Sequence, residues 1–181
     1  RPSGKIMKVF NTPLIDASIV IADKYEDDRG FFMESFNEQK FLREVGFHSF
    51  VQDNHSKSSK GVLRGLHYQI KHPQGKLMRC TQGAVYDVIV DLRESSKSFG
   101  LWFNATLNDP SSMIWIPPGF AHGFYTLTDT AEVQYKTTDY YFPQHERSLL
   151  WSELDITWPN KDNPILSDKD AKGKTFEECE K

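Results

Sequence analysis

The stretch Gly61-Val62-Leu63-Arg64-Gly65-Leu66-His67-Tyr68-Gln69 is strand-like, is bracketed by glycine and carries one arginine and one histidine. Side chains alternate between the two faces of an extended chain, so His67 would share a face with Leu63, Gly65 and Gln69. A histidine facing the inside of a small β-barrel lies in an apolar setting where its basicity can be tuned. We therefore expect the rest of the chain to build a pocket around His67. A hydrogen-bonded core histidine is the competing interpretation.

Other short segments with strand periodicity follow one another at a spacing of roughly ten residues, with turn signals between them. In the segment 83–93, apolar residues such as Val88 and Val90 alternate with Asp87 and Asp91. In the segment 131–138, Val133 and Tyr135 fall on the same face and should point inward. This pattern predicts an all-β fold, best described as a cupin-type double-stranded β-helix, or jelly roll, with a few short helices.

One convincing helix is expected after residue 36. Asn37 is a suitable N-cap, Phe36 and Phe41 stand at the positions of a hydrophobic staple, and Gly46 would end the helix. A second, short helix is expected to open at Ser167. The polar segment 56–60 is expected to be a mobile loop.

The bulk composition favours a single domain over residues 7–181, preceded by a tag or linker remnant at 1–6. The net charge of −3 gives no indication of nucleic-acid binding. No apolar run approaches the ~18 residues of a membrane-spanning helix, and no secretory leader is visible. Cys80 and Cys179, the two cysteines, suggest neither a disulfide framework nor a zinc site, so we expect a protein of the reducing cytoplasm.

Five side chains are candidates for acid–base chemistry, and each also has a structural interpretation. His122 follows a Pro-Pro-Gly turn and could simply cap it, and Tyr135 could be a core tyrosine bonded to backbone. Lys76 could be solvated, and Asp170 stands at the capping-box distance from Ser167. No one of them is specific, but their joint presence with His67 on one small barrel favours a site.

A bound metal is not expected. A barrel metal site usually needs a His-x-His pair with a carboxylate and a further histidine, and Gln69 stands where the second histidine of the pair would be. Nucleophile-elbow, dinucleotide-binding and Walker motifs are also missing. The sequence therefore predicts a pocket that uses no metal and no cofactor.

At this level of detail the chain resembles the dTDP-4-dehydrorhamnose 3,5-epimerase family, which is a family of cupin-fold enzymes acting on nucleotide sugars. The resemblance runs in order from about residue 7 to 171. It is carried by the segments 28–34 (Asp-Arg-Gly-Phe-Phe-Met-Glu), 50–56 (Phe-Val-Gln-Asp-Asn-His-Ser), 62–69, 74–77 (Gln-Gly-Lys-Leu), 85–93, 116–124 (Ile-Pro-Pro-Gly-Phe-Ala-His-Gly-Phe), 135–141 and 165–170.

The resemblance implies a role for each of four residues. His67 matches the general base, Tyr135 the general acid, Asp170 the carboxylate that orients the histidine, and Lys76 the lysine beside the C4 oxygen of the sugar. Further positions are implied to bind the nucleotide sugar, and Tyr140 or Phe31 to offer an aromatic face to the thymine. The binding positions are Arg29, Glu34, Gln52, Asp53, Asn54, Arg64, Lys76, His122, Glu146 and Lys169. The segment 144–147, which contains Glu146, departs from the small polar residues usual in the family at this place.

The implied reaction is proton removal and return at C3 and C5 of a dTDP-linked 4-keto-6-deoxy sugar, with no cofactor, by a homodimer that exchanges N-terminal strands. An enzyme that acts at only C3 or only C5 is one alternative. A sugar-binding barrel without turnover and a metal-dependent cupin oxygenase are two others. The resemblance also raises a geometric problem, because Arg64 and His67 fall on opposite faces of a regular strand. A bulge or a strong twist at Gly65 would bring both to the ligand.

Overall fold

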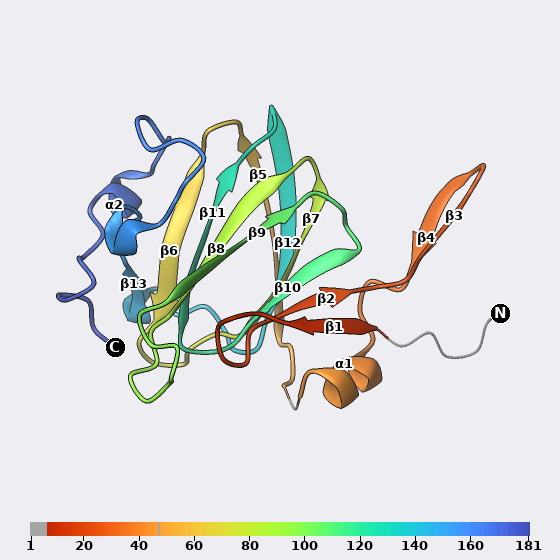
Figure 1. The fold of residues 1–181 in the computed structure, drawn as a ribbon, viewed down its shortest axis with the longest axis horizontal. Helices are drawn as coiled ribbons and strands as arrows, with labels where there is room; N and C mark the ends of the chain where they lie inside the picture. The colour runs from red at the N-terminus through yellow and green to blue at the C-terminus, as the bar shows by residue number, and fades with distance from the viewer. Residues whose placement is uncertain (1–6, 47) are drawn as a thin grey trace.

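Two antiparallel sheets lie face to face and enclose the main hydrophobic core (Figure 1). The six-stranded sheet has the order β1-β2-β10-β7-β12-β5, and the five-stranded sheet has the order β13-β6-β11-β8-β9. The computed structural model describes residues 7–46 and 48–181, so the suggested tag or linker at 1–6 lies outside the described residues. This arrangement confirms the predicted all-β jelly roll of the cupin type.

The strands of the six-stranded sheet are β1 (Lys8–Asn11), β2 (Ser18–Ile21), β5 (Gln52–Ser59), β7 (Lys76–Gln82), β10 (Ser112–Ile116) and β12 (Thr130–Thr137). Those of the five-stranded sheet are β6 (Leu63–Gln69), β8 (Val85–Asp91), β9 (Trp102–Leu107), β11 (Phe120–Thr126) and β13 (Glu146–Ser148). The remaining elements are the hairpin strands β3 (Lys24–Asp27) and β4 (Gly30–Met33), the helices α1 (Glu38–Glu44) and α2 (Asp168–Ala171), and the 3₁₀ turns η1 (Pro143–His145) and η2 (Glu153–Asp155).

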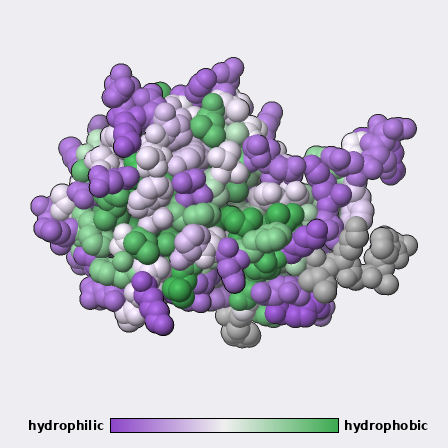
Figure 2. All heavy atoms as spheres, viewed as in Figure 1, coloured by the Kyte–Doolittle hydropathy of each residue, from purple (hydrophilic) through white to green (hydrophobic). Residues whose placement is uncertain are grey.

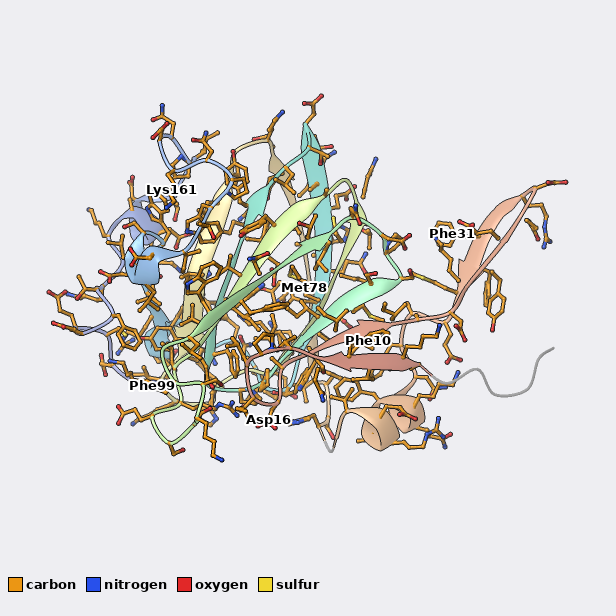
Figure 3. The ribbon with its side chains drawn as sticks, viewed as in Figure 1. Phe10, Asp16, Phe31, Met78, Phe99 and Lys161 are labelled. Carbon is orange, nitrogen blue, oxygen red and sulfur yellow. The ribbon has the colours of Figure 1, made fainter. Side chains whose placement is uncertain are left out.

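The core between the sheets is built from the inward positions of the alternating strands. Met78 of β7 and Val133 of β12 meet Ile89 of β8 and Phe124 of β11 there, and Met78 lies in the middle of the barrel (Figure 3). Each sheet also buries part of its outer face. The helix α1 covers β2 and β10 through Phe41, and the C-terminal segment covers the five-stranded sheet. Almost every position of β8 is therefore buried, including Asp87.

The helix α1 confirms the capping prediction. The Asn37 side chain accepts a hydrogen bond from the backbone N–H of Lys40, and Phe36 packs on Phe41 with ring centroids 6.0 Å apart. The N–H of Gly46, which has a φ of +145°, donates to the carbonyl of Phe41 and closes the last turn.

The segment 56–60 corrects one prediction, because β5 continues to Ser59 instead of ending in a mobile loop. This strand pairs with β12 over its whole length and forms the edge of the six-stranded sheet. Its side chains are polar on both faces, so hydrophobic alternation gives no sign of it. Backbone pairing with β12 holds it in place.

A bulge in β6 resolves the conflict between Arg64 and His67. His67 pairs with His122 of β11, and Arg64 pairs with Phe124. The two pairing residues are three positions apart on β6 but only two positions apart on β11, so β6 contains one extra residue. Leu63, on one side of the bulge, and Leu66, on the other, both pack into the outer core cluster. The expectation that Leu63 shares a face with His67 is therefore wrong, and the predicted bulge at Gly65 is confirmed.

Glycine is required at this bulge for a steric reason. Gly65 has a φ of +131°, and a Cβ placed on it would lie 2.5 Å from the Cα of Gly123 and 2.8 Å from the carbonyl oxygen of His122. A Cβ on Gly123 would lie 2.6 Å from the carbonyl oxygen of Arg64. Two glycines thus let β6 and β11 approach closely where both strands present their histidines.

The hairpin of β3 and β4 projects from the barrel into solvent (Figure 1), and Phe31 extends from it (Figure 3). Phe31 and Phe32 are exposed by 55% and 73%. On the face shown in Figure 2, hydrophobic side chains also gather in the lower middle, over the region of β1 and β2, where Phe10 is exposed. Within the described residues, none of the helices combines the length and the apolar character needed to cross a membrane.

Candidate active site

A pocket of about 510 Å³ opens between the two sheets and gathers most of the predicted site residues. Its lining includes residues of β5, β6, β7, β11, β12 and α2. The predicted residues that line it are Asn54, Arg64, His67, Lys76, His122, Tyr135, Lys169 and Asp170. The fold therefore converges on the face of β6 that carries His67.

His67 is held by a carboxylate from the short helix α2. Its Nε2 lies 2.6 Å from Oδ1 of Asp170, whose Oδ2 accepts a hydrogen bond from the backbone N–H of Gly65. Ser167 caps α2 by accepting from the N–H of Asp170, as its spacing predicted. Burial acts to raise the pKa of Asp170, but the hydrogen bonds from His67 and Gly65 hold it below its ordinary value. A charged Asp170 keeps the proton of a neutral His67 on Nε2, so Nδ1 carries the free lone pair.

Glu146 lies beside His67 and organises two neighbours. Its carboxylate accepts hydrogen bonds from Lys169, at 2.7 Å, and from the hydroxyl of Tyr141, and its Oε1 is 3.7 Å from Nδ1 of His67. Burial opposes these contacts, yet the pKa of Glu146 stays below its ordinary value. The bond to Glu146 raises the pKa of Tyr141 to about 12, so this phenol stays protonated at neutral pH.

Lys76 enters the pocket from β7 and is 8% exposed. Burial lowers its pKa to about 8, although the negative charges of Glu146 and Asp87 act in the opposite direction. Its Nζ lies 5.6 Å from the centroid of the Tyr135 ring, and it forms no ion pair within 4 Å in the described part of the chain. This ammonium group is therefore available to an oxygen atom in the pocket.

Tyr135 comes from β12, on the same face of the six-stranded sheet as Lys76, because Thr137 is the register partner of Lys76. Burial raises the pKa of Tyr135, with the side chain of Asn54 acting against the shift. At neutral pH the phenol is thus protonated. His67 belongs to the other sheet, so the two side chains reach the pocket from opposite walls.

Asp87 is a site residue that sequence reasoning missed. It is fully buried on β8, and its Oδ1 lies 2.6 Å from Nε2 of His122 on β11. The signal for it was present, since an aspartate at the centre of a strand of apolar residues needs a partner. The interpretation of His122 as a turn cap does not hold, because its ring lines the pocket beside His67.

Gln69 occupies the position where a metal-binding histidine would stand, and its side chain forms hydrogen bonds to the backbone of neighbouring loops. Its amide nitrogen donates to the carbonyls of His72 and Tyr140, and its Oε1 accepts from the N–H of Phe142. Gln52 accepts a hydrogen bond from the N–H of Tyr141 through its Oε1 and donates one from its amide nitrogen to Oδ1 of Asn54. These two amides fix the segment 140–142 at the edge of the pocket. Across the described residues, no set of three or more His, Cys, Asp or Glu side chains is arranged to hold a metal ion.

Besides Gln52 and Glu146, four predicted binding residues do not line this pocket. Arg29 is at the tip of the β3–β4 hairpin, where it pairs with Asp27, and Glu34 pairs with Lys40 at 2.9 Å. Asp53 pairs with Lys136 and borders a second hollow, which adjoins the first along β5 and β12. Tyr140 is more than half exposed. The neighbouring Tyr141 is the tyrosine that contacts Glu146.

The remaining contact of the site is the support of Arg64. Its Nε donates to the hydroxyl of Ser58 on β5 at 2.9 Å, which holds the guanidinium group at the pocket edge. The pocket thus combines cationic groups at its edge with an imidazole on one wall and a phenol on the other. Such a set can bind an anionic ligand and move protons on both faces of a ring.

Comparisons with known proteins agree on one family. The family model described as dTDP-4-dehydrorhamnose 3,5-epimerase matches residues 11–178. The enzyme of that name from Pseudomonas aeruginosa is 49% identical over 178 residues, which cover 96% of this chain and 98% of the relative. A crystal structure of the Legionella pneumophila epimerase in complex with dTDP-4-keto-L-rhamnose is 44% identical, with a TM-score of 0.93 and coverage of 96% and 95%. A 3′-monoepimerase from Streptomyces bikiniensis, crystallised with dTDP, is 31% identical, with a TM-score of 0.84 and coverage of 91% and 85%.

Proposed function

The chain belongs to the dTDP-4-dehydrorhamnose 3,5-epimerase family, and we propose that His67, Asp170, Tyr135 and Lys76 carry out its reaction. It is an isomerase that converts dTDP-4-dehydro-6-deoxy-D-glucose to dTDP-4-dehydro-L-rhamnose by inverting C3 and C5. The observation that carries the assignment of roles is the arrangement of one imidazole and one phenol on opposite walls of a single pocket.

The first proposed step is proton removal by His67. The C4 ketone of the sugar acidifies the protons on C3 and C5, and Nδ1 of the neutral imidazole takes one of them. Asp170, bonded at Nε2, holds the ring in the required tautomer and stabilises the imidazolium that forms. The carboxylate of Glu146, 3.7 Å from Nδ1, adds negative charge on the side where the new N–H appears.

Lys76 stabilises the enolate in this proposal. Removing a proton next to the ketone places negative charge on the C4 oxygen, and the ammonium group offsets that charge inside a buried pocket. Tyr135 then donates its phenolic proton to the carbon from the opposite face, which inverts the centre. The steps are proton transfers, so they require neither a redox cofactor nor a metal.

Nucleotide binding assigns roles to the cations at the pocket edge. Arg64 suits a forked contact with the diphosphate, and Asn54, His122 and Lys169 are polar groups for the sugar and phosphates. Glu146 acts mainly through Lys169 and Tyr141, which it binds. Gln52 acts through the segment 140–142, whose tyrosines Tyr140 and Tyr141 are available to stack on thymine.

In a homodimer, the predicted binding residues that lie far from their own pocket could contact the ligand in the other subunit. The β3–β4 hairpin extends away from its own barrel, carries exposed Phe31 and Phe32, and holds Arg29 at its tip (Figure 1). In the proposed dimer each hairpin reaches the pocket of the other subunit, so that Arg29 and Glu34 serve a site that is not their own. Asp53 and its neighbours at the second hollow would then lie near the subunit contact.

The test of the reaction is NMR of the sugar nucleotide in deuterated water. Solvent deuterium should enter at C3 and at C5, and the product should be the L-rhamno isomer. Exchange confined to C3, as a monoepimerase would give, supports the alternative of a single inverted centre. No exchange at either carbon rules out the assignment. We place the reaction in the cytoplasm, where nucleotide sugars are made.

A further inference from the structure

A second histidine–carboxylate pair lies beside the first and has no role in the proton transfers described above. Oδ1 of Asp87 is 2.6 Å from Nε2 of His122, and the exposed fractions of the two residues are 0% and 6%. By comparison, the side chain of His67 is 28% exposed. The inner pair is thus more deeply buried than the proposed catalytic pair, and burying a carboxylate is costly unless it is paired and hydrogen-bonded.

The strand register places this pair in one row with His67. His122 of β11 is directly opposite His67 on β6, and Asp87 of β8 is opposite Phe124, two residues along β11 from His122. Residues two apart on a strand share a face, so Asp87, His122 and His67 line up on the inner face of the five-stranded sheet. Both imidazoles therefore line the pocket and are anchored at Nε2 by a carboxylate, which leaves Nδ1 as the nitrogen without a carboxylate hydrogen bond.

Burial favours a neutral His122. It is the largest influence on the pKa of His122 and lowers it; Asp87 acts against this shift, and Lys76 of the facing sheet and His67 add to it. Burial raises the pKa of Asp87, but His122 and Lys76 act against that shift. The 2.6 Å contact fits an Asp87 carboxylate that accepts a hydrogen bond from Nε2–H of a neutral His122, with Lys76 as the nearby cationic group.

We propose that Asp87 is a positioning residue: it keeps the proton of His122 on Nε2, so that Nδ1 accepts a hydrogen bond from a sugar hydroxyl beside the reacting carbons. An imidazole in this tautomer cannot donate from Nδ1 to the enolate oxygen, so that task stays with Lys76. A sugar hydroxyl near the ketone can donate a hydrogen bond, and the unprotonated Nδ1 of His122 can accept it. The identity of the ligand in this inference rests on the proposed function. The tautomer of His122 depends only on its contact with Asp87.

Only one oxygen of the Asp87 carboxylate is hydrogen-bonded within the described residues, which supports a role directed at His122 alone. Oδ2 is buried and has no hydrogen-bond partner among residues 7–46 and 48–181, so the carboxylate directs its one hydrogen bond to His122. A carboxylate present only to stabilise the fold would be expected to use both oxygens. Asp91 on the same strand does so, with Arg93, Ser96 and Ser98 as its partners.

The tautomer can be measured on the unmodified protein with ¹⁵N-labelled histidine. The signals of His122 are assigned by their loss in His122→Gln, and we expect a protonated Nε2 and an unprotonated Nδ1 at neutral pH. A proton on Nδ1, or on both nitrogens, would overturn the proposal. This measurement needs no turnover, so it separates failure of the inference from failure of the proposed function.

The catalytic consequence is tested with Asp87→Asn, which keeps the shape but can donate to His122 and reverse its tautomer. We expect kcat/KM to fall by about ten- to a hundredfold, by analogy with the carboxylates that orient metal-binding histidines. In a His122→Gln background the same substitution should have almost no further effect. Thr126→Val is the matched control. Thr126 is buried on β11, and its hydroxyl, like Oδ2 of Asp87, has no hydrogen-bond partner within the described residues, so its replacement should leave rate and tautomer unchanged. Equal losses from Asp87→Asn in both backgrounds would refute the coupling.

Discussion

His67 and Tyr135 reach one pocket from opposite sheets of the barrel, His67 from β6 and Tyr135 from β12. This separation matters because an epimerase must take a proton from one face of a carbon and return one to the other. A single group on one wall would return the proton to the face from which it came. Asp170 holds the ring of His67 through a hydrogen bond at Nε2, and burial raises the pKa of Tyr135, so that its phenol keeps its proton.

Replacing His67 by alanine should abolish proton removal. We expect deuterium incorporation at both C3 and C5 to fall by about 10³-fold or more, since the variant lacks the base that starts each step. Binding of dTDP, measured by calorimetry, should change little because the diphosphate contacts lie elsewhere. A variant that still exchanges at the wild-type rate would show that another group is the base.

Replacing Tyr135 by phenylalanine should separate exchange from inversion. The ring keeps its volume and its contact with Lys76, but the proton donor on the second face is lost. His67 can still remove a proton and return a deuteron to the same face. We therefore expect deuterium at the reacting carbons of recovered substrate, with product formation reduced by about 10²-fold or more. Inversion at the wild-type rate would remove Tyr135 from the mechanism.

Lys76 should set the alkaline limit of the reaction. Its pKa is lowered to about 8, so the ammonium form dominates below that pH and is lost as the pH rises through it. We expect kcat/KM to decline above about pH 8, because the enolate then loses its counter-charge. In Lys76→Met the rate at pH 7 should drop by about 10²- to 10³-fold, as for the loss of one oxyanion stabiliser. The decline near pH 8 should also disappear in this variant. If it persists, another group titrates there.

Gly65 should be intolerant of a side chain because it allows β6 and β11 to meet. A Cβ would lie 2.5 Å from the Cα of Gly123, and backbone atoms on both sides limit relaxation. We expect Gly65→Ala to lower the free energy of unfolding by about 2 kcal/mol or more, by combining overpacking with a left-handed φ. Gly46→Ala has a positive φ but open space around it, so it should cost only about 1–2 kcal/mol. Equal losses in thermal or urea unfolding would remove the packing argument.

The sequence predicts those parts of the fold in which local chemistry and global packing agree. Asn37 caps its helix, as predicted, and Val133 and Tyr135 share the face of β12 that points into the barrel. The bulge at Gly65 lets both Arg64 and His67 reach the pocket. The missed features are those whose partners lie far away in the chain. The polar strand β5 exists because β12 pairs with it, and no periodicity of its own marks it as a strand.

The site shows the same division. The motifs identify His67, Lys76, Tyr135 and Asp170, and the fold brings them together. Asp87 was visible only as a charge in an apolar strand, because its purpose depends on His122, 35 residues away in the chain. Arg29 is the converse case, since the resemblance implies that it binds ligand while the fold of one subunit carries it away from the pocket.

Mixed dimers test whether Arg29 serves the pocket of the other subunit. We expect Arg29→Ala and His67→Ala each to be almost inactive as homodimers, because every site then lacks one group. In a heterodimer of the two, one site lacks both groups, but the other combines intact His67 with intact Arg29 from the partner. Equal amounts of the two variants, unfolded and refolded together, should therefore recover about a quarter of the wild-type activity, since about half of the dimers are mixed and each holds one complete site.

If Arg29 acted in its own subunit, every site in every dimer would lack a group and no activity would return. Refolding each variant alone is the control, and size-exclusion chromatography with light scattering verifies that dimers have formed.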